Sequence, residues 1–215
     1  MAVGATDRDG RAVRRVLGSL DWGRRPRVCL ELRMDVSEEL LEKTKAELED
    51  LAQAGVVMAG NAFSPVLLVK GEPEEEDDSP EGAPALLGGP DGDALRACLK
   101  ALGYAPEEWV GLSTRDAEGY PLVPGTLRLA IATLDPSTLI ALDDAAAEAL
   151  RETFADELVE LTDLEAATLA PGKVAQVLGM RVLALGGFEQ CLSDPKAKQL
   201  MWARLKQVPP LSEPY

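Results

Sequence analysis

The chain has no histidine among its 215 residues. This absence removes the commonest metal ligand, a frequent general base and the only side chain that normally titrates near neutral pH. Only three cysteines are present, Cys29, Cys98 and Cys191, and their spacing fits neither a zinc motif nor a disulfide framework. We interpret them as reduced thiols of a cytoplasmic protein, and we expect neither a metal site nor a cofactor.

Long apolar runs are also missing. No stretch approaches the roughly 18–20 apolar residues that a membrane span requires, and the first residues lack the apolar segment of a secretory signal. We therefore expect a cytoplasmic protein without membrane contact. Hydrophobic residues still make up 46% of the chain, which is ordinary for a soluble globular domain.

Positive charge is scarce outside the first residues. The formal net charge is −15, yet residues 1–33 hold eight arginines and four acids, so the rest of the chain carries −19. Nucleic-acid binding depends on cations that neutralise phosphates, so most of this surface is unsuited to it. The basic segment could contact nucleic acid or an acidic partner, but we favour packing on its own acidic domain. We interpret residues 1–60 as a basic, helical appendage and residues 61–215 as the main domain.

Four short apolar runs alternate with helical patterns in the main domain. We predict strands at residues 66–70, 109–113, 138–142 and 181–185, and helices at residues 93–102, 125–134, 143–154 and 195–205. This alternation is typical of a parallel sheet with helices on both faces. We therefore predict an α/β fold, a three-layer α/β/α sandwich around a mostly parallel sheet of about four strands. Nearer the N-terminus, we predict a helix at 7–19, a strand at 27–33 and a helix from Ser37 to about Gly55.

The carboxyl ends of the predicted strands locate the candidate site, because ligands of open α/β sheets bind beyond those ends. The strand ends lead into residues 71–76, 114–116, 143–144 and 186–190. The candidate cleft residues there are Lys70, Glu72, Thr114, Asp143 and Phe188.

Four segments, in order, resemble the uracil-DNA glycosylase superfamily, most closely its iron–sulfur bacterial and archaeal branch. Residues 69–78 align without a gap on the segment V-G-E-G-P-G-A-E-E-D, and residues 134–142 resemble the strand I-R-P-K-V-I-V-A-L. Residues 187–195 align on H-P-A-Y-L-L-R-N-P, and residues 196–202 match the closing helix. The resemblance covers about residues 64–207 and implies the glycosylase-like α/β/α fold.

The departures from the family pattern fall on its chemistry. The water-activating acid of the family aligns with Gly71, the uracil-recognising Asn with Thr114, and the motif histidine with Gly187. The aromatic ring that stacks on the flipped base falls near Ala85 or Leu86. The cluster cysteines have no counterparts, so we expect no iron–sulfur cluster.

These losses predict a glycosylase-like protein without catalytic activity. A flipped base must be held by stacking and by hydrogen bonds, and losing one donor to the leaving group typically costs on the order of 10²–10³ in rate. We therefore expect an interaction or regulatory role, through an unidentified protein partner or a weak nucleic-acid contact. The alternative is an active base-excision enzyme whose catalytic residues have moved. A third hypothesis is an unrelated small-molecule enzyme that uses the acidic cleft.

Several polar residues have two interpretations. Glu72 begins a run of seven carboxylates in residues 72–81, which we interpret mainly as a solvated loop, with Glu72 as the candidate for a relocated acid. Asp143 is either half of a catalytic pair with Asp144 or, as we favour, a helix N-cap. Lys196 and Lys198 lie on the last predicted helix, where they contact DNA or a partner, or only cover an amphipathic helix.

Overall fold

The computed structural model describes residues 42–72 and 86–211. The chain divides into two compact units, Met1–Thr44 and Lys45–Tyr215, and the sheet with its flanking helices belongs to the second. The predicted helix at 7–19 and the predicted strand at 27–33 lie outside the described residues. So does the acidic run after Glu72.

All four predicted strands are present and parallel to one another. They are β2 (Val66–Lys70), β3 (Val110–Asp116), β4 (Thr138–Ala141) and β6 (Met180–Ala184). Every residue of β2 is buried, because this strand lies between β3 and β4 and is covered on both faces. A continuous apolar run is the pattern that such a strand requires.

Two further strands make the sheet larger and mixed. The sheet has six strands in the order β1-β3-β2-β4-β6-β5. At its edges, β1 (Val56–Gly60) pairs antiparallel with β3, and β5 (Val174–Val177) pairs antiparallel with β6. The α/β class is therefore confirmed, but the expectation of about four mostly parallel strands was wrong.

The β5–β6 hairpin shows why one edge strand was missed. Its two-residue turn, Leu178–Gly179, has positive φ at both positions, 50° and 86°, as a type I′ turn requires. The usual sequence signal for this turn is Asn-Gly or Asp-Gly, and leucine in the first position hides it. β5 is also only four residues long, which gives little alternation to detect.

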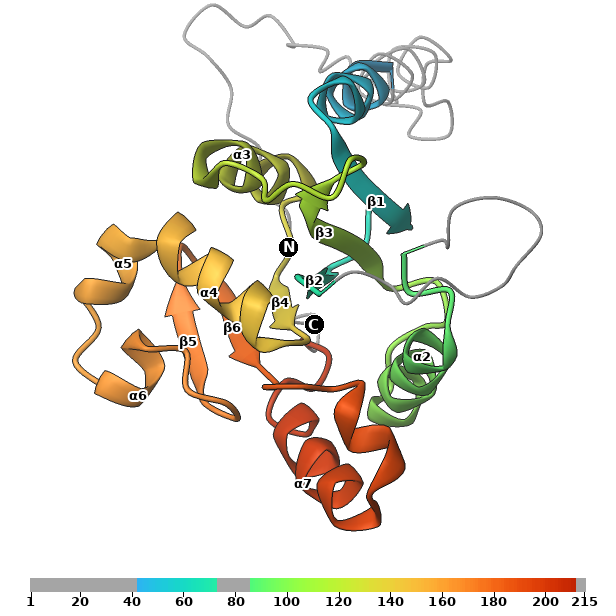
Figure 1. Cartoon of the computed structure of the whole chain (residues 1–215), viewed down its shortest axis with the longest axis vertical. Helices are drawn as coiled ribbons and strands as arrows, with labels where there is room; N and C mark the ends of the chain where they lie inside the picture. Colours follow the sequence, from blue (N-terminus) through green and yellow to red (C-terminus); the bar gives the residue numbers. More distant parts are fainter. Residues whose placement is uncertain (1–41, 73–85, 212–215) are drawn as a thin grey trace, which may run out of the picture. The chain divides into compact units, whose positions relative to one another are not determined.

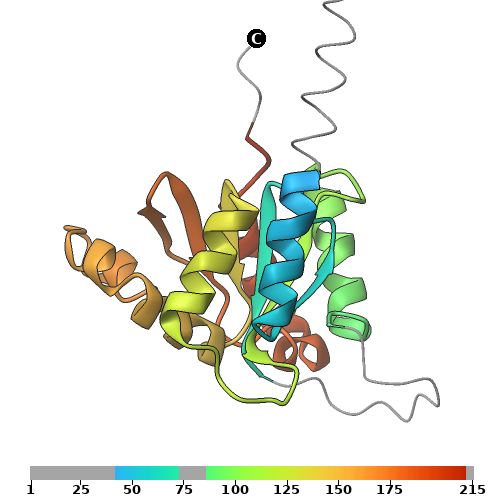
Figure 2. The ribbon, with the colours of Figure 1, turned by 90° about the horizontal axis from the view of Figure 1, so that it is seen from above.

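Helices cover both faces of the sheet (Figures 1 and 2). α2 (Pro90–Leu102) and α7 (Pro195–Leu205) bury apolar residues in one core, which includes Val66 and Leu68 of β2. α3 (Pro124–Leu134) and α4 (Asp144–Thr153) share the other core with Leu67 and Val69. Alternate side chains of one strand thus reach opposite cores, as the period of two demands.

Shorter elements complete the unit. They are α5 (Ala155–Val159), α6 (Leu164–Ala167) and the 3-10 helix η1 (Gln190–Ser193). Residues 42–53 are helical, and Leu48 and Leu51 contribute to the core that contains α3 and α4. Within the described residues, no helix has both the length and the apolar character needed to cross a membrane.

Candidate functional site

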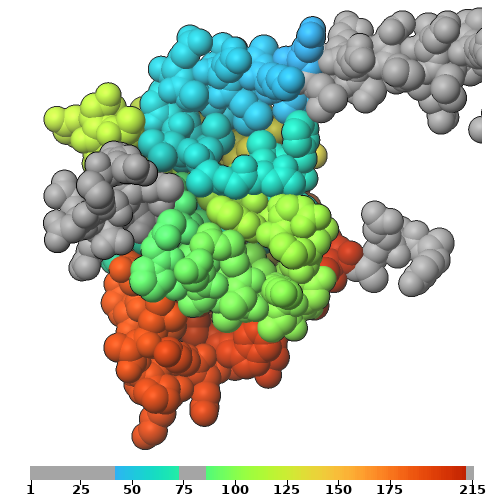
Figure 3. All heavy atoms as spheres, turned by 90° about the vertical axis from the view of Figure 1, so that its right-hand side faces the viewer, coloured from blue at the N-terminus to red at the C-terminus, as the bar shows by residue number. Residues whose placement is uncertain are grey.

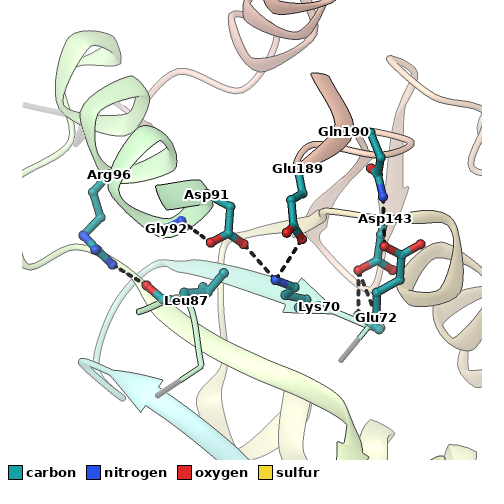
Figure 4. Close-up of polar contacts among 10 residues, drawn as sticks. Lys70, Glu72, Leu87, Asp91, Gly92, Arg96, Asp143, Glu189 and Gln190 are labelled. Carbon is teal, nitrogen blue, oxygen red and sulfur yellow. Dashed lines mark hydrogen bonds and ion pairs between the residues drawn. The ribbon is translucent and has the colours of Figure 1, made fainter. Parts of the chain in front are cut away.

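The crevice beyond the carboxyl end of β2 contains a cluster of three charged side chains (Figure 4). Lys70 is the last residue of β2, and its Nζ lies 2.8 Å from Oδ2 of Asp91 and 3.3 Å from Oε2 of Glu189. The Lys70 side chain is only 4% exposed and that of Asp91 is 7% exposed, whereas Glu189 is 43% exposed. Since a buried charge is stable only when it is paired, each of the two buried groups depends on the other.

The start of α2 holds Asp91 in place. The other carboxylate oxygen of Asp91, Oδ1, accepts a hydrogen bond of 2.7 Å from the backbone N–H of Gly92. Asp91 lies in the first helical turn, where the helix dipole favours negative charge. Both oxygens of Asp91 therefore have partners, and the carboxylate is fixed toward Lys70.

A second carboxylate, Asp143, ties the end of β2 to the start of α4. Its Oδ2 accepts hydrogen bonds from the backbone N–H groups of Gly71 and Glu72, at 2.9 and 3.0 Å. Its Oδ1 accepts one of 2.7 Å from the N–H of Ala146. Asp143 is thus the N-cap of α4, as predicted, and its oxygens are used in holding two elements together.

Gly71 lies where no side chain fits. A Cβ atom built at this position would come within 2.4 Å of the Ala146 nitrogen and 2.8 Å of the Ala145 Cβ. The backbone of α4 therefore occupies the space that a side chain at position 71 would need. An acid could not be placed here without displacing the start of the helix.

Glu72 lies at the mouth of the crevice. It is exposed, and its Oε2 accepts a hydrogen bond of 3.0 Å from Nε2 of Gln190. The remaining cavity has a volume of about 10 Å³, which is room for roughly one water molecule. The residues that line it are Lys70, Glu72, Asp91, Leu142, Asp143, Phe188, Glu189 and Gln190.

Four of the five predicted cleft residues meet around this cavity. Lys70, Glu72, Asp143 and Phe188 all line it, whereas Thr114 does not. Thr114 is buried in β3. The next residue, Arg115, reaches the end of β2, where its Nε donates a hydrogen bond of 3.0 Å to the Gly71 carbonyl oxygen.

Asp91, Glu189 and Gln190 were not among the predicted cleft residues, although Glu189 and Gln190 lie in the segment 186–190 that was expected to border the site. Asp91 follows the proline that begins α2, and an acid in a first helical turn is usually explained by the helix dipole alone. The signal that could have found it is Lys70, a charged residue at the end of an otherwise apolar strand. A lysine there requires an acidic partner from a neighbouring element.

Gly187 belongs to the turn after β6. Gly186 and Gly187 have φ values of 68° and 87°, and the N–H groups of Gly187 and Phe188 both donate to the Leu142 carbonyl oxygen, at 3.2 and 2.9 Å. The glycine pair thus forms a tight turn that places Phe188 beside the cavity.

The two predicted contact lysines lie on α7, away from this cavity. Lys196 and Lys198 are exposed, and neither lines the space at Lys70. Lys198 instead lines a separate apolar groove between α2 and α7.

Metal-binding capacity is not evident in the part of the chain that the structure describes. No group of three or more Cys, Asp or Glu side chains is arranged there to hold a metal ion. Cys98 and Cys191 are free thiols. Burial is the main cause that raises the pKa of each thiol, which makes both less reactive as nucleophiles.

No protein-family profile matches the chain, and no curated protein is significantly similar to it.

Proposed function

We propose that this chain is a catalytically inactive protein with a uracil-DNA glycosylase-like, three-layer fold, and that it acts through interactions rather than base excision. The observation that carries the proposal is the ion pair of Lys70 with Asp91. This pair and Glu189 occupy the crevice where an α/β protein of this kind would hold its ligand.

The remaining space supports the same conclusion. A nucleobase needs an enclosed pocket with a stacking surface and hydrogen-bond partners, and the cavity at Lys70 has a volume of about 10 Å³. Opening it would separate the buried Lys70 ammonium from its carboxylate. Breaking such a pair typically costs about 3–5 kcal/mol, which substrate binding would have to offset.

The residues at the family's motif positions also support inactivity. Gly71, which aligns with the water-activating acid, has no space for a side chain because of α4. Gly187, which aligns with the motif histidine, forms a turn. Thr114, which aligns with the base-recognising Asn, does not line the cavity.

A relocated active site is the second candidate, and Glu72 is the observation that favours it. Its carboxylate is exposed at the mouth of the crevice and is oriented by Gln190. In an active enzyme, Glu72 would take the place of the missing acid at position 71.

The deciding experiment measures uracil release from single- and double-stranded oligonucleotides, with an active glycosylase as the positive control. We expect no release by the wild-type protein above the buffer background. Robust release that Glu72→Gln abolishes and the control Glu118→Gln preserves would replace our proposal with the relocated-acid enzyme. Glu118 is a suitable control because it is exposed in the turn after β3. Robust release that Glu72→Gln leaves unchanged would contradict both candidates.

A further inference from the structure

A second hollow, lined mainly by apolar side chains, lies between α2 and the C-terminal elements η1 and α7. We call it the α2–α7 groove, and its volume is about 390 Å³. Figure 3 shows α2, in green, directly beside the orange and red C-terminal segment. The groove is lined by Ala94, Ala97, Cys98, Phe188, Cys191, Leu192, Lys198, Met201, Trp202 and Leu205.

Small residues on one side and large ones on the other produce the hollow. Ala94 and Ala97 are three residues apart on α2, so they share a helix face. They line the groove together with the larger Met201 and Trp202 of α7. The volume falls within the roughly 300–1,000 Å³ that is typical of small-molecule sites, which are mostly apolar with a few polar groups.

The one charged residue in the lining is a cation, although the chain as a whole is strongly acidic. Lys198 forms no ion pair with any carboxylate in residues 42–72 and 86–211. Burial raises the pKa of the Cys191 thiol in the groove wall, and the positive charges of Lys198 and Arg204 act in the opposite direction.

These features define the ligand by its chemistry. An apolar lining of this size binds a hydrocarbon or aromatic body. A single ammonium is a point charge that suits one carboxylate, whereas phosphate groups are usually held by several donors or by the forked guanidinium of arginine. An acidic chain of this net charge would repel a polyanion such as DNA.

We propose that the α2–α7 groove binds a small amphipathic carboxylate, with its apolar body in the groove and its carboxylate paired with Lys198. This inference does not depend on the proposed glycosylase-like fold, because it concerns a different hollow, which shares only Phe188 with the crevice at Lys70.

The experiment uses three probes with the same ten-carbon chain and different heads, namely decanoate, decanol and decyltrimethylammonium. The two charged probes are kept below their micelle concentrations, and decanol is kept below its solubility limit. Binding to the full chain is measured by titration calorimetry. Alkylation of the thiols by iodoacetamide, located by peptide mass spectrometry, then reports whether a bound probe covers Cys98 and Cys191.

Lys198→Gln removes the proposed partner of the carboxylate. Lys196→Gln is the matched control, since Lys196 is exposed on the same helix and does not line the groove.

We expect decanoate to bind more tightly than decanol, and the cationic probe to bind most weakly. Lys198→Gln should weaken decanoate binding by on the order of tenfold, as the loss of a charged hydrogen bond would, while Lys196→Gln should change it less than twofold. Ala97→Phe places a ring in the groove and should abolish binding, with an unchanged circular dichroism spectrum as the check on folding. The inference is overturned if no probe binds, if decanol binds as tightly as decanoate, or if binding survives Ala97→Phe.

Discussion

The crevice at Lys70 and the α2–α7 groove lie on the same side of the sheet and share one residue, Phe188, yet they are built in opposite ways. The crevice is polar and nearly filled, with ion pairs and backbone hydrogen bonds joining β2 to α2 and α4. The groove is apolar and open, with a volume of about 390 Å³ against about 10 Å³ for the cavity in the crevice.

The difference shows that the usual location of a ligand site in an α/β fold does not by itself identify one. The strand ends in this protein are occupied by the protein's own side chains, which hold the sheet and helices together. One space that a ligand could enter, the α2–α7 groove, lies between two helices instead. Substitutions in the crevice should therefore affect stability, and those in the groove should affect binding.

The largest stability effect should come from Lys70→Met, which leaves the buried Asp91 carboxylate unpaired. Loss of one partner of a buried ion pair typically costs about 3–5 kcal/mol, and urea denaturation would measure the change in unfolding free energy. The double variant Lys70→Met/Asp91→Leu should recover much of the loss, because an apolar pair can replace a buried ion pair. Lys198→Met is the matching change in the groove, and it should alter the unfolding free energy by less than about 0.5 kcal/mol. Equal effects of the two lysine substitutions would remove the distinction between the two regions.

Gly71→Ala should have the next largest effect. The added methyl would approach the Ala146 nitrogen to 2.4 Å, so α4 must shift, at a cost of roughly 1–3 kcal/mol. Gly125→Ala is the control, because a Cβ there meets nothing within 4 Å and alanine is the better helix former. Thermal unfolding should therefore show a lower Tm for Gly71→Ala and an unchanged or higher Tm for Gly125→Ala. A Gly71→Ala protein as stable as the wild type would mean that β2 and α4 are not in close contact.

Asp143→Ala should destabilise the protein somewhat less. It removes the N-cap of α4 and the partner of two backbone N–H groups, and loss of an N-cap typically costs about 0.5–2 kcal/mol. Asp163→Ala is the comparison, because Asp163 caps the short α6 and is exposed. Chemical denaturation of both variants tests this order, and a larger loss for Asp163→Ala would contradict it.

The smallest effect concerns the two thiols in the groove. Burial raises the pKa of Cys98 and of Cys191 above the ordinary value of 9.0. As the pH rises, the unfolded chain therefore loses these protons before the folded chain does. The contribution of the two thiols to the free energy of unfolding is thus fully present well below pH 9 and is lost as the pH rises above 9. Replacing both thiols by alanine should reduce the loss of stability between about pH 8 and about pH 10, measured as the difference in unfolding free energy from the wild type. An identical pH dependence in the two proteins would show that the thiols are not protected by burial.

The sequence predicted the centre of the fold better than its edges. The four parallel strands and the helices α2, α3, α4 and α7 were predicted within a few residues, because their apolar spacing and their proline or aspartate starts are local signals. The edge strands β1 and β5 were not predicted. Their place in the sheet depends on pairing with distant residues rather than on their own pattern.

The candidate site was predicted only in part, for a similar reason. Lys70, Glu72, Asp143 and Phe188 meet because parallel strands end at one edge of the sheet, which the order of elements implies. Asp91 and Glu189 reach the same place from α2 and from the loop before η1. No local pattern shows which acid a buried lysine will pair with, since the choice depends on how helices pack across the sheet.

The lack of space at position 71 limits any attempt to add a water-activating acid to this protein by substitution. Exchanging glycine for aspartate there requires only one residue to change, but the space for the new carboxylate is filled by the backbone of Ala145 and Ala146. Backbone atoms cannot be trimmed by substitution as a side chain can. Placing an acid there would require α4 to begin later or elsewhere, and Asp143, which caps it, would lose its two partners at the end of β2. An engineer would therefore have to redesign a loop and a helix start together.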